Sequence, residues 1–281
     1  MKVREICQWI DRIAPFDTQA DFDNSGLLVG DENREVSGIH VALDVTDRVL
    51  DEAEDAGANL LITHHPMMFS ARRRMTETDS EGRLLARMIR ARMALIAAHT
   101  NLDRATGGIN DVLAARCGLT QVTGEGYLRV GALPDGTTAG NLPRALANAL
   151  RTTVRVCGQT DPDRPLRRMA VSSGAGSDGW EEAAALGAEV FLTGEMKHHH
   201  ALAMADAGIL ALEAGHFATE EPGIFALADA LQKEADAVQW SLRITRSRCG
   251  AYAMPRAYEG GCPTDGCYGN ALVLHEGGHE G

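Results

Sequence analysis

The chain has 281 residues, 44% of them apolar, and a formal net charge of −12. This length and apolar content suffice for one large domain or two ordinary ones with a buried core. The acidic balance argues against nonspecific binding to nucleic acid or to an anionic membrane, because proteins that neutralise phosphates normally present a basic face.

The beginning of the chain predicts a helix rather than a targeting segment. Residues 1–15 mix charged and apolar positions at helical spacing and lack the apolar core and cleavage site of a secretory signal. No stretch approaches the roughly 20 apolar residues that a membrane span requires. The six cysteines are scattered along the chain, which favours reduced thiols. We therefore expect a cytoplasmic protein without disulfides.

Residues 23–30, DNSGLLVG, predict a turn followed by a strand. Asp, Asn, Ser and Gly are turn formers, and the LLV that follows is an ordinary buried run. Within this turn, Asn24 is the residue best placed to reach a ligand.

The next segment predicts a strand, a helix and a second strand. GIHVALDV at 38–45 favours a strand, Gly57 takes the position that ends a helix, and LLIT at 60–63 is a short buried strand. His64 and His65 follow this strand directly.

The same order recurs 130 residues later in the chain. Residues 168–173 supply the strand, Gly187 ends the helix, and VFLT at 190–193 is the second strand. At an offset of 117, LIAAHTNLD at 95–103 matches LEAGHFATE at 212–220. The pattern predicts an α/β protein made of two similar α/β units, an internal duplication, with mixed sheets.

Composition suggests where these units begin and end. We expect a first unit over 1–122, a Gly-rich linker over 123–136, a second unit over 137–245, and a partly mobile C-terminal extension over 246–281. A final strand is expected at about 237–243, and a helix opening at Pro222 is expected to run to about Lys233. Cys262 and Cys267 lie in the extension, and their spacing fits no structural zinc pattern.

Histidines and carboxylates gather after three of these strands. They are His64 with His65, His99 four residues before Asp103, and His216 four residues before Glu220. Ligands lie beyond the carboxyl ends of strands in open α/β sheets, so we expect a metal site in the cleft between the units. Neighbouring side chains of an extended segment point to opposite sides, so His64 and His65 would serve two ions beside a shared carboxylate. These ligands suit Zn, Fe(II), Mn or Co. For each His alone, a hydrogen-bonded core or surface residue is the alternative.

A second histidine run, His198 to His200, follows the corresponding strand of the second unit. His198 or His199 is a candidate acid or base that lines the cavity, and the alternative is the start of a surface helix. Glu195 occupies the position of His65 in the other copy and is a comparable candidate.

Six short motifs occur in order along the chain. They are DNSGLLVG at 23–30, ITHHP at 62–66, HTNLD at 99–103, GGIND at 107–111, TGEMKHH at 193–199 and GHFATE at 215–220. This series closely resembles the NIF-three-like dinuclear-metal family, also called GTP cyclohydrolase I type 2 homologues. The resemblance reaches to about residue 245. It implies two α/β units, metal ions in the cleft between them, and a homohexameric ring built as a trimer of dimers.

Carried over position by position, the resemblance makes five residues the ligands of two divalent metal ions: His64, His65, Asp103, His216 and Glu220. It implies that Glu220 bridges the ions and that His99 borders the site as a sixth residue. The family name implies hydrolytic opening of the imidazole ring of GTP. Proton transfer would then fall to His99, Glu195 or His198. Arg72 to Arg74 fit either contacts to the triphosphate or a solvated loop.

Two other classes of function stay open beside the hydrolase. A nonenzymatic metal-handling or regulatory protein needs the same ligands but no residue positioned to move protons. Binding to DNA or to a transcription factor, which the family's older naming suggests, fits poorly with the acidic charge. We therefore expect a metal-dependent hydrolase that acts on a nucleotide or a related small molecule, GTP being the first candidate.

Overall fold

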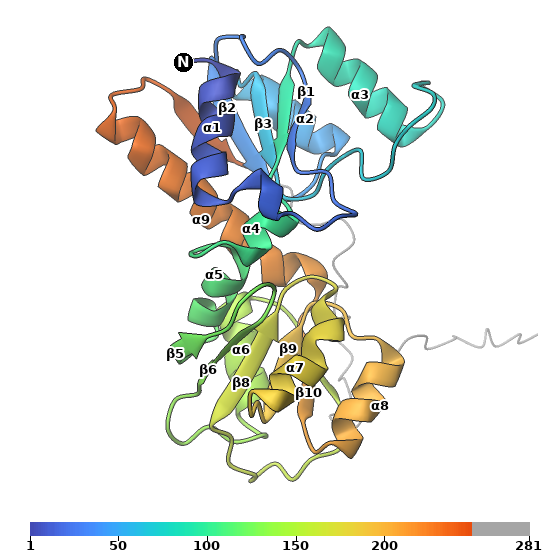
Figure 1. Cartoon of the computed structure of the whole chain (residues 1–281), viewed down its shortest axis with the longest axis vertical. Coiled ribbons are helices and arrows are strands. Elements are labelled where there is room, and N and C mark those ends of the chain that lie inside the picture. Colours follow the sequence, from blue (N-terminus) through green and yellow to red (C-terminus); the bar gives the residue numbers. More distant parts are fainter. Residues whose placement is uncertain (249–281) are drawn as a thin grey trace, which may run out of the picture.

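The computed structural model describes residues 1–248, in which two α/β units lie one above the other along the longest axis (Figure 1). The helices and 3-10 turns are α1 (Val3–Ile13), η1 (Phe16–Thr18), α2 (Asp47–Asp55), α3 (Ser80–Arg90), α4 (Thr100–Arg104), α5 (Ile109–Arg116), α6 (Leu142–Leu150), η2 (Gly176–Gly179), α7 (Trp180–Ala185), α8 (His198–Asp206) and α9 (His216–Ala237). The strands are β1 (Gly26–Val29), β2 (Gly38–Ala42), β3 (Leu60–Thr63), β4 (Ala94–Ala97), β5 (Thr120–Thr123), β6 (Arg129–Ala132), β7 (Arg155–Cys157), β8 (Arg168–Ser172), β9 (Val190–Thr193), β10 (Leu210–Glu213) and β11 (Arg243–Arg246).

Each unit is built on one mixed sheet. The first sheet has the order β1-β4-β3-β2-β11 and the second the order β5-β6-β8-β9-β10-β7. Strands β2, β3 and β4 run parallel, as do β8, β9 and β10. The same parallel triplet therefore stands in both sheets, which confirms the predicted α/β class with two mixed sheets.

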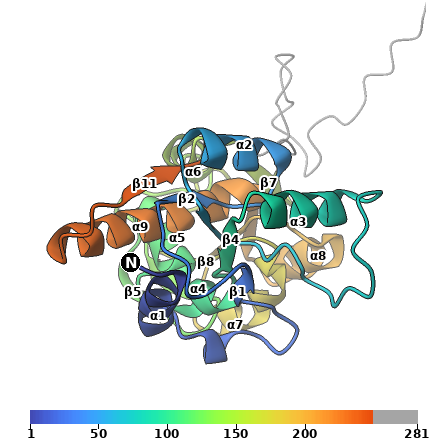
Figure 2. The ribbon, with the colours of Figure 1, turned by 90° about the horizontal axis from the view of Figure 1, so that it is seen from above.

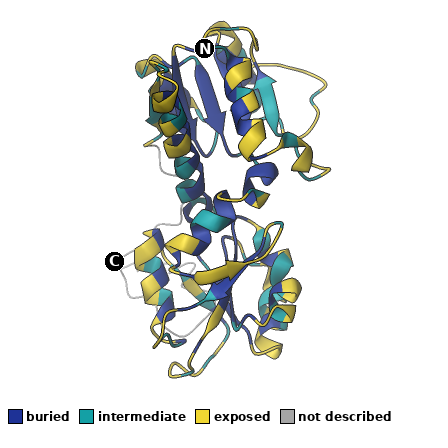
Figure 3. Ribbon diagram, turned by 60° about the vertical axis from the view of Figure 1, so that its left-hand side comes forward, coloured by how far each residue is buried: buried dark blue, intermediate teal, exposed yellow. Residues whose placement is uncertain are grey.

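Local sequence explains the matching halves. Helices α2 and α7 are both followed by a glycine with positive φ, Gly57 at 70° and Gly187 at 77°, which is the conformation that ends a helix. The strands LLIT and VFLT are buried at every position. They read as continuous apolar runs because helices cover both faces of the sheet: in the first unit α1 and α9 pack on one face and α2 and α3 on the other (Figure 2). Figure 3 shows the buried strands of both units.

Helices α5 and α9 join the two units. A Cβ atom on Gly223 of α9 would lie 2.7 Å from the Cα of Ile109 on α5, so the two backbones are in close contact. Ile109 packs into the core of the first sheet, whereas Leu113, one helical turn later, packs into the core of the second unit. Helix α5 therefore contributes to the cores of both units.

The structure differs from the expected organisation at two places. The expected linker, 123–136, contains β6, which pairs with β8 inside the second sheet. The last strand, β11, lies a few residues later than expected and pairs with β2 of the first sheet. It reaches that sheet because α9, with 22 residues, carries the chain back across the junction over about 33 Å. Cys262 and Cys267 lie outside the described residues.

Helix α9 also begins at His216, six residues before the predicted start at Pro222. Proline normally disrupts a helix because it has no N–H to donate to the carbonyl four residues earlier. The turn before it is held by Thr219, whose hydroxyl donates to the carbonyls of Gly215 at 3.1 Å and His216 at 2.8 Å. None of the helices within residues 1–248 has the length and apolar character to cross a membrane.

Candidate metal centre

The three predicted ligand groups meet at the junction of the units. Parallel pairing sets Thr63, the last residue of β3, beside Ala97, the last residue of β4. His64 and His99 therefore leave the first sheet at the same edge. From the second unit, α9 begins directly after β10 and presents His216 and Glu220, which are four residues apart on one helical face.

Within the described residues, three groups of ligand atoms lie within 4.8 Å of one another. They are His64, Asp103 and Glu220; His65, His216 and Glu220; and His64, His65 and His99. All five predicted ligands and His99 are thus brought together, and the adjacent pair His64 and His65 takes part in different carboxylate-containing groups.

Each of the four imidazoles is oriented by a partner of its Nδ1 atom. The partners are the carbonyl of Ala98 for His64 at 2.8 Å, Asp44 for His65 at 2.7 Å, Asp23 for His99 at 2.7 Å, and Glu195 for His216 at 2.9 Å. The Nε2 atoms of His64, His65 and His216 then lie toward the carboxylates of Asp103 and Glu220. Metal-binding histidines in proteins characteristically use one ring nitrogen for such a partner and the other for the metal.

The Nε2 of His64 tests whether a cation fits this arrangement. This atom is buried and has no hydrogen-bond partner. Its nearest charged neighbours are oxygens of Asp103 at 3.5 Å and of Glu220 at 3.8 Å. A neutral imidazole nitrogen and two carboxylates are all acceptors, so a positive ion between them satisfies all three. The ligand set therefore fits a metal ion.

Glu220 lies between the two carboxylate-containing groups. Its side chain is 5% exposed, with Oε1 facing His64 and Oε2 lying 3.0 Å from the Nε2 atoms of both His65 and His216. Oε2 nevertheless makes no well-directed hydrogen bond. One carboxylate oxygen thus faces each group.

Charges within the group compensate one another. Burial disfavours charged His64, but the carboxylates of Asp103 and Glu220 outweigh this and raise its pKa. Burial also opposes charge on His65, yet the nearby carboxylates of Asp44 and Glu220 raise its pKa to about 10. Burial alone would raise the pKa of Glu220, whereas the surrounding histidines hold it well below its usual range. Burial raises the pKa of Asp103, and a metal ion would compete with protons for the imidazole nitrogens and carboxylate oxygens.

The second unit contributes close backbone contacts. Gly174, in the loop after β8, has a φ of 56°, and a Cβ there would lie 2.2 Å from Oε1 of Glu220. The neighbouring amide of Ser173 donates to Asn110 at 2.8 Å, and the Ser173 hydroxyl lies 3.5 Å from Asp103. The loop therefore closes over the carboxylates only because residue 174 has no side chain.

The three predicted proton-transfer residues lie in different surroundings. His99 is 17% exposed and belongs to the group with His64 and His65. Glu195 is 60% exposed and contacts the site through His216. His198 begins α8 on the surface and belongs to none of the three groups. Of the three, His99 is the residue that faces the centre.

Two carboxylates of the site were not among the residues singled out from the sequence. Asp23 binds His99, and Asp44 binds His65. Asn24, which was expected to reach a ligand, instead donates to the carbonyl of Met68 at 2.6 Å. Asp23 stands in a turn of polar residues, which carries no distinguishing pattern. Asp44 lies just past the carboxyl end of β2, and that position is a signal that could have indicated it.

Within the arginine cluster Arg72 to Arg74, Arg72 forms ion pairs with neighbouring acidic residues. Arg72 pairs with Asp79 at 2.8 Å and with Glu81, and so fastens the loop before α3. Arg73 and Arg74 are exposed. Arg72 is therefore engaged in ion pairs within the protein.

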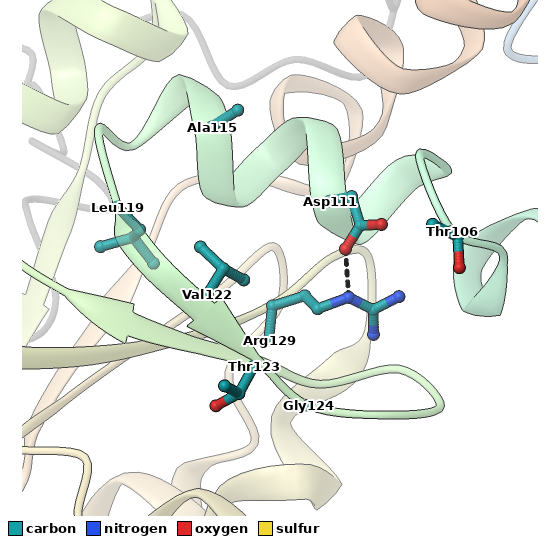
Figure 4. A pocket seen from close by; sticks show the side chains of 8 residues that line it. All are labelled: Thr106, Asp111, Ala115, Leu119, Val122, Thr123, Gly124 and Arg129. Atoms are coloured by element: carbon teal, nitrogen blue, oxygen red, sulfur yellow. Dashed lines mark hydrogen bonds and ion pairs between the residues drawn. The ribbon is translucent and has the colours of Figure 1, made fainter.

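A hollow of about 400 Å³ lies elsewhere, between α5 and the strands β5 and β6 (Figure 4). Arg129 lines it but is bound to Asp111 and to the carbonyls of Gly126 at 3.0 Å and Leu128 at 2.9 Å. Its guanidinium is thus saturated by the protein, and the candidate site is the histidine and carboxylate group.

Asp44 provides a test of the orienting contacts. We expect Asp44→Ala to weaken the binding of Zn²⁺ by about 10- to 100-fold, because His65 loses the partner that fixes its ring. Asp47→Ala is the matched control, since Asp47 lies three residues later and pairs on the surface with Arg83 at 2.7 Å. Competition with a chelator of known affinity measures both. Equal affinities in the two variants would refute the role of Asp44.

Comparison with known proteins gives consistent matches. The family model described as Duf34/NIF3 (NGG1p interacting factor 3) matches residues 1–250. A Clostridium acetobutylicum protein named GTP cyclohydrolase 1 type 2 homolog is 32% identical over 243 residues, covering 83% of this chain and 90% of the relative. Reduced HcgD from Methanocaldococcus jannaschii is 28% identical with a TM-score of 0.74, covering 88% and 97% of the two chains. A Staphylococcus aureus protein at 24% identity shares the fold, with a TM-score of 0.86 and coverage of 92% and 99%.

Proposed function

Because this chain belongs to the Duf34/NIF3 family, we propose that it binds two divalent metal ions and acts as a metal-dependent hydrolase on a nucleotide or a related small molecule. The observation that carries the proposal is the position of Glu220, with one oxygen toward His64 and the other 3.0 Å from His65 and His216. A single buried carboxylate placed in this way supports two ions rather than one.

The proposed ligands divide into two sets. His64 and Asp103 would hold one ion, His65 and His216 would hold the other, and Glu220 would be shared, in line with the groups that these residues form. Nitrogen and carboxylate donors of this kind suit Zn, Fe(II), Mn or Co. Two cations held there would lower the pKa of a water molecule toward neutrality and polarise the bond that it attacks.

His99 is the residue we assign to proton transfer. Its Nδ1 is held by Asp23, whose side chain is completely buried, and its ring lies in the group with His64 and His65. Burial opposes charge on Asp23, but hydrogen bonds from His99 and Thr100 lower its pKa, so it stays a carboxylate. This fixes the ring orientation of His99 and leaves Nε2 free to take up or release a proton. Glu195 positions His216 and has no assigned step of its own.

GTP is the first substrate to test, since the Clostridium acetobutylicum relative is named a GTP cyclohydrolase 1 type 2 homolog. The protein should be loaded separately with Zn, Fe(II), Mn and Co and then incubated with GTP and other nucleotides. We expect product from at least one loaded form and none from metal-free protein or from His64→Ala. His200→Ala serves as control, because His200 contacts Ser177 at 3.1 Å and lies outside the groups of ligands.

The same experiment separates an enzyme from a metal-handling protein. Two bound ions without turnover of any nucleotide would contradict the hydrolase and favour a role in metal transfer. Failure to bind two ions per chain would contradict the metal centre itself.

A further inference from the structure

Two exposed phenylalanines stand beside the candidate metal centre. Phe22 is 66% exposed and Phe69 is 49% exposed. Their ring centroids lie 6.0 Å apart, and the ring of Phe69 lies 6.1 Å from that of His99 at an angle of 78°. Large aromatic side chains normally gain free energy by burial, so two exposed rings in contact with each other and with a site residue indicate a binding surface.

The loops that carry these rings are tied to each other and to the site. The side chain of Asn24 donates to the carbonyl of Met68 at 2.6 Å, which links the two loops that carry Phe22 and Phe69. Asp23 accepts from the backbone amide of Thr100 at 3.0 Å as well as binding His99. The two phenylalanines are thus held at a set position relative to His99 by several hydrogen bonds.

The rings form a continuous series that ends at the proposed ligands. After Phe22, Phe69 and His99, the next ring centroids are those of His64 and His65, at 5.1 Å and 5.5 Å from His99. A flat molecule resting on Phe69 would therefore have its edge near His99 and the ligand group. The exposed rings of Phe22 and Phe69 therefore lie directly beside the site of the proposed reaction.

We propose that Phe22 and Phe69 bind the planar heteroaromatic ring of the substrate by stacking, and that they select a ring compound such as a nucleobase over an aliphatic one. This inference rests on the proposed function, since it names the class of substrate for the same site. Aromatic side chains stack on heteroaromatic rings because both present π-faces. A macromolecular partner fits less well, because stable protein interfaces bury about 800 Å² per partner and two rings supply well under that.

Binding measured without turnover tests this proposal. Calorimetric titrations of metal-loaded protein should use guanosine, adenosine, cytidine and inorganic triphosphate as separate probes. We expect each of the single variants Phe69→Leu and Phe22→Leu to weaken nucleoside binding about tenfold or more. The affinity for triphosphate should stay unchanged. Phe69→Tyr keeps a ring and should bind nucleosides like the unaltered protein. Tyr127→Leu is the control, because Tyr127 is 38% exposed and lies in the second unit.

The outcomes separate this inference from the proposed function. Nucleoside binding that is equal in Phe69→Leu and the unaltered protein, or absent from the unaltered protein for all three nucleosides, overturns the stacking role. A parallel loss of triphosphate binding and of metal content would show damage to the site instead and also overturns it. If nucleosides bind through the phenylalanines but the loaded protein turns nothing over, the hydrolase fails and the ring-binding surface stands.

Discussion

Replacing Glu220 with glutamine is expected to remove both metal ions from the protein and not one alone. The substitution keeps the size of the side chain but removes the charge that faces both His64 and the pair of His65 and His216. We expect the affinity for each ion to fall by more than about 100-fold, since even partners of the ligands typically contribute 10- to 100-fold. Metal content after dialysis, measured by mass spectrometry, gives the number of ions that remain.

Glu221→Gln is the matched control for this experiment. Glu221 is the next residue of α9, is half-buried, and belongs to none of the three ligand groups within residues 1–248. The control should keep two ions per chain. A Glu220→Gln protein that still holds two ions would show that this carboxylate is not shared, and one that holds a single ion would assign it to one site only.

Gly174→Ala, in the loop after β8, is expected to abolish metal binding at the same site. The new methyl group would lie 2.2 Å from Oε1 of Glu220, so this buried carboxylate would have to leave its position. The φ of 56° adds roughly 1–2 kcal/mol of backbone strain for a residue with a side chain. We expect loss of metal binding together with a lower free energy of unfolding in urea.

Gly187→Ala separates strain from displacement of the carboxylate. Gly187 has a φ of 77° with nothing within 4 Å of the added atom, so only the strain of roughly 1–2 kcal/mol applies. This control should unfold more easily than the unaltered protein but keep its metal. If Gly174→Ala also keeps its metal, the loop after β8 does not confine Glu220.

The repeat in the sequence was sufficient to predict the centre of each unit. The glycines that end α2 and α7 and the buried strands after them are local signals, and the parallel triplets follow from them. The candidate ligands were also visible, because histidines and carboxylates follow the ends of apolar runs, and the resemblance to a known family selected five of them.

Contacts between distant residues were not predictable in this way. Asp23 and His99 are 76 positions apart, and nothing in a turn of polar residues indicates which imidazole its carboxylate will meet. The sheet to which strand β11 belongs was not predictable either. Its four residues, RITR, are half-exposed or exposed, so they carry no apolar pattern that would assign them to one sheet. Its place depends on the path of α9, whose first turn is held by hydrogen bonds from the Thr219 hydroxyl.

The position of β11 has a consequence for synthesis of the protein on the ribosome. The outer edge of β2 gains its neighbour only when residues 243–246 arrive, about 200 residues after β2 itself has been made. Throughout that interval the nascent chain carries a bare strand edge that is able to pair with another molecule. A fragment that contains the first unit without β11 would keep the edge of β2 unpaired. We therefore expect this fragment to self-associate when it is expressed alone.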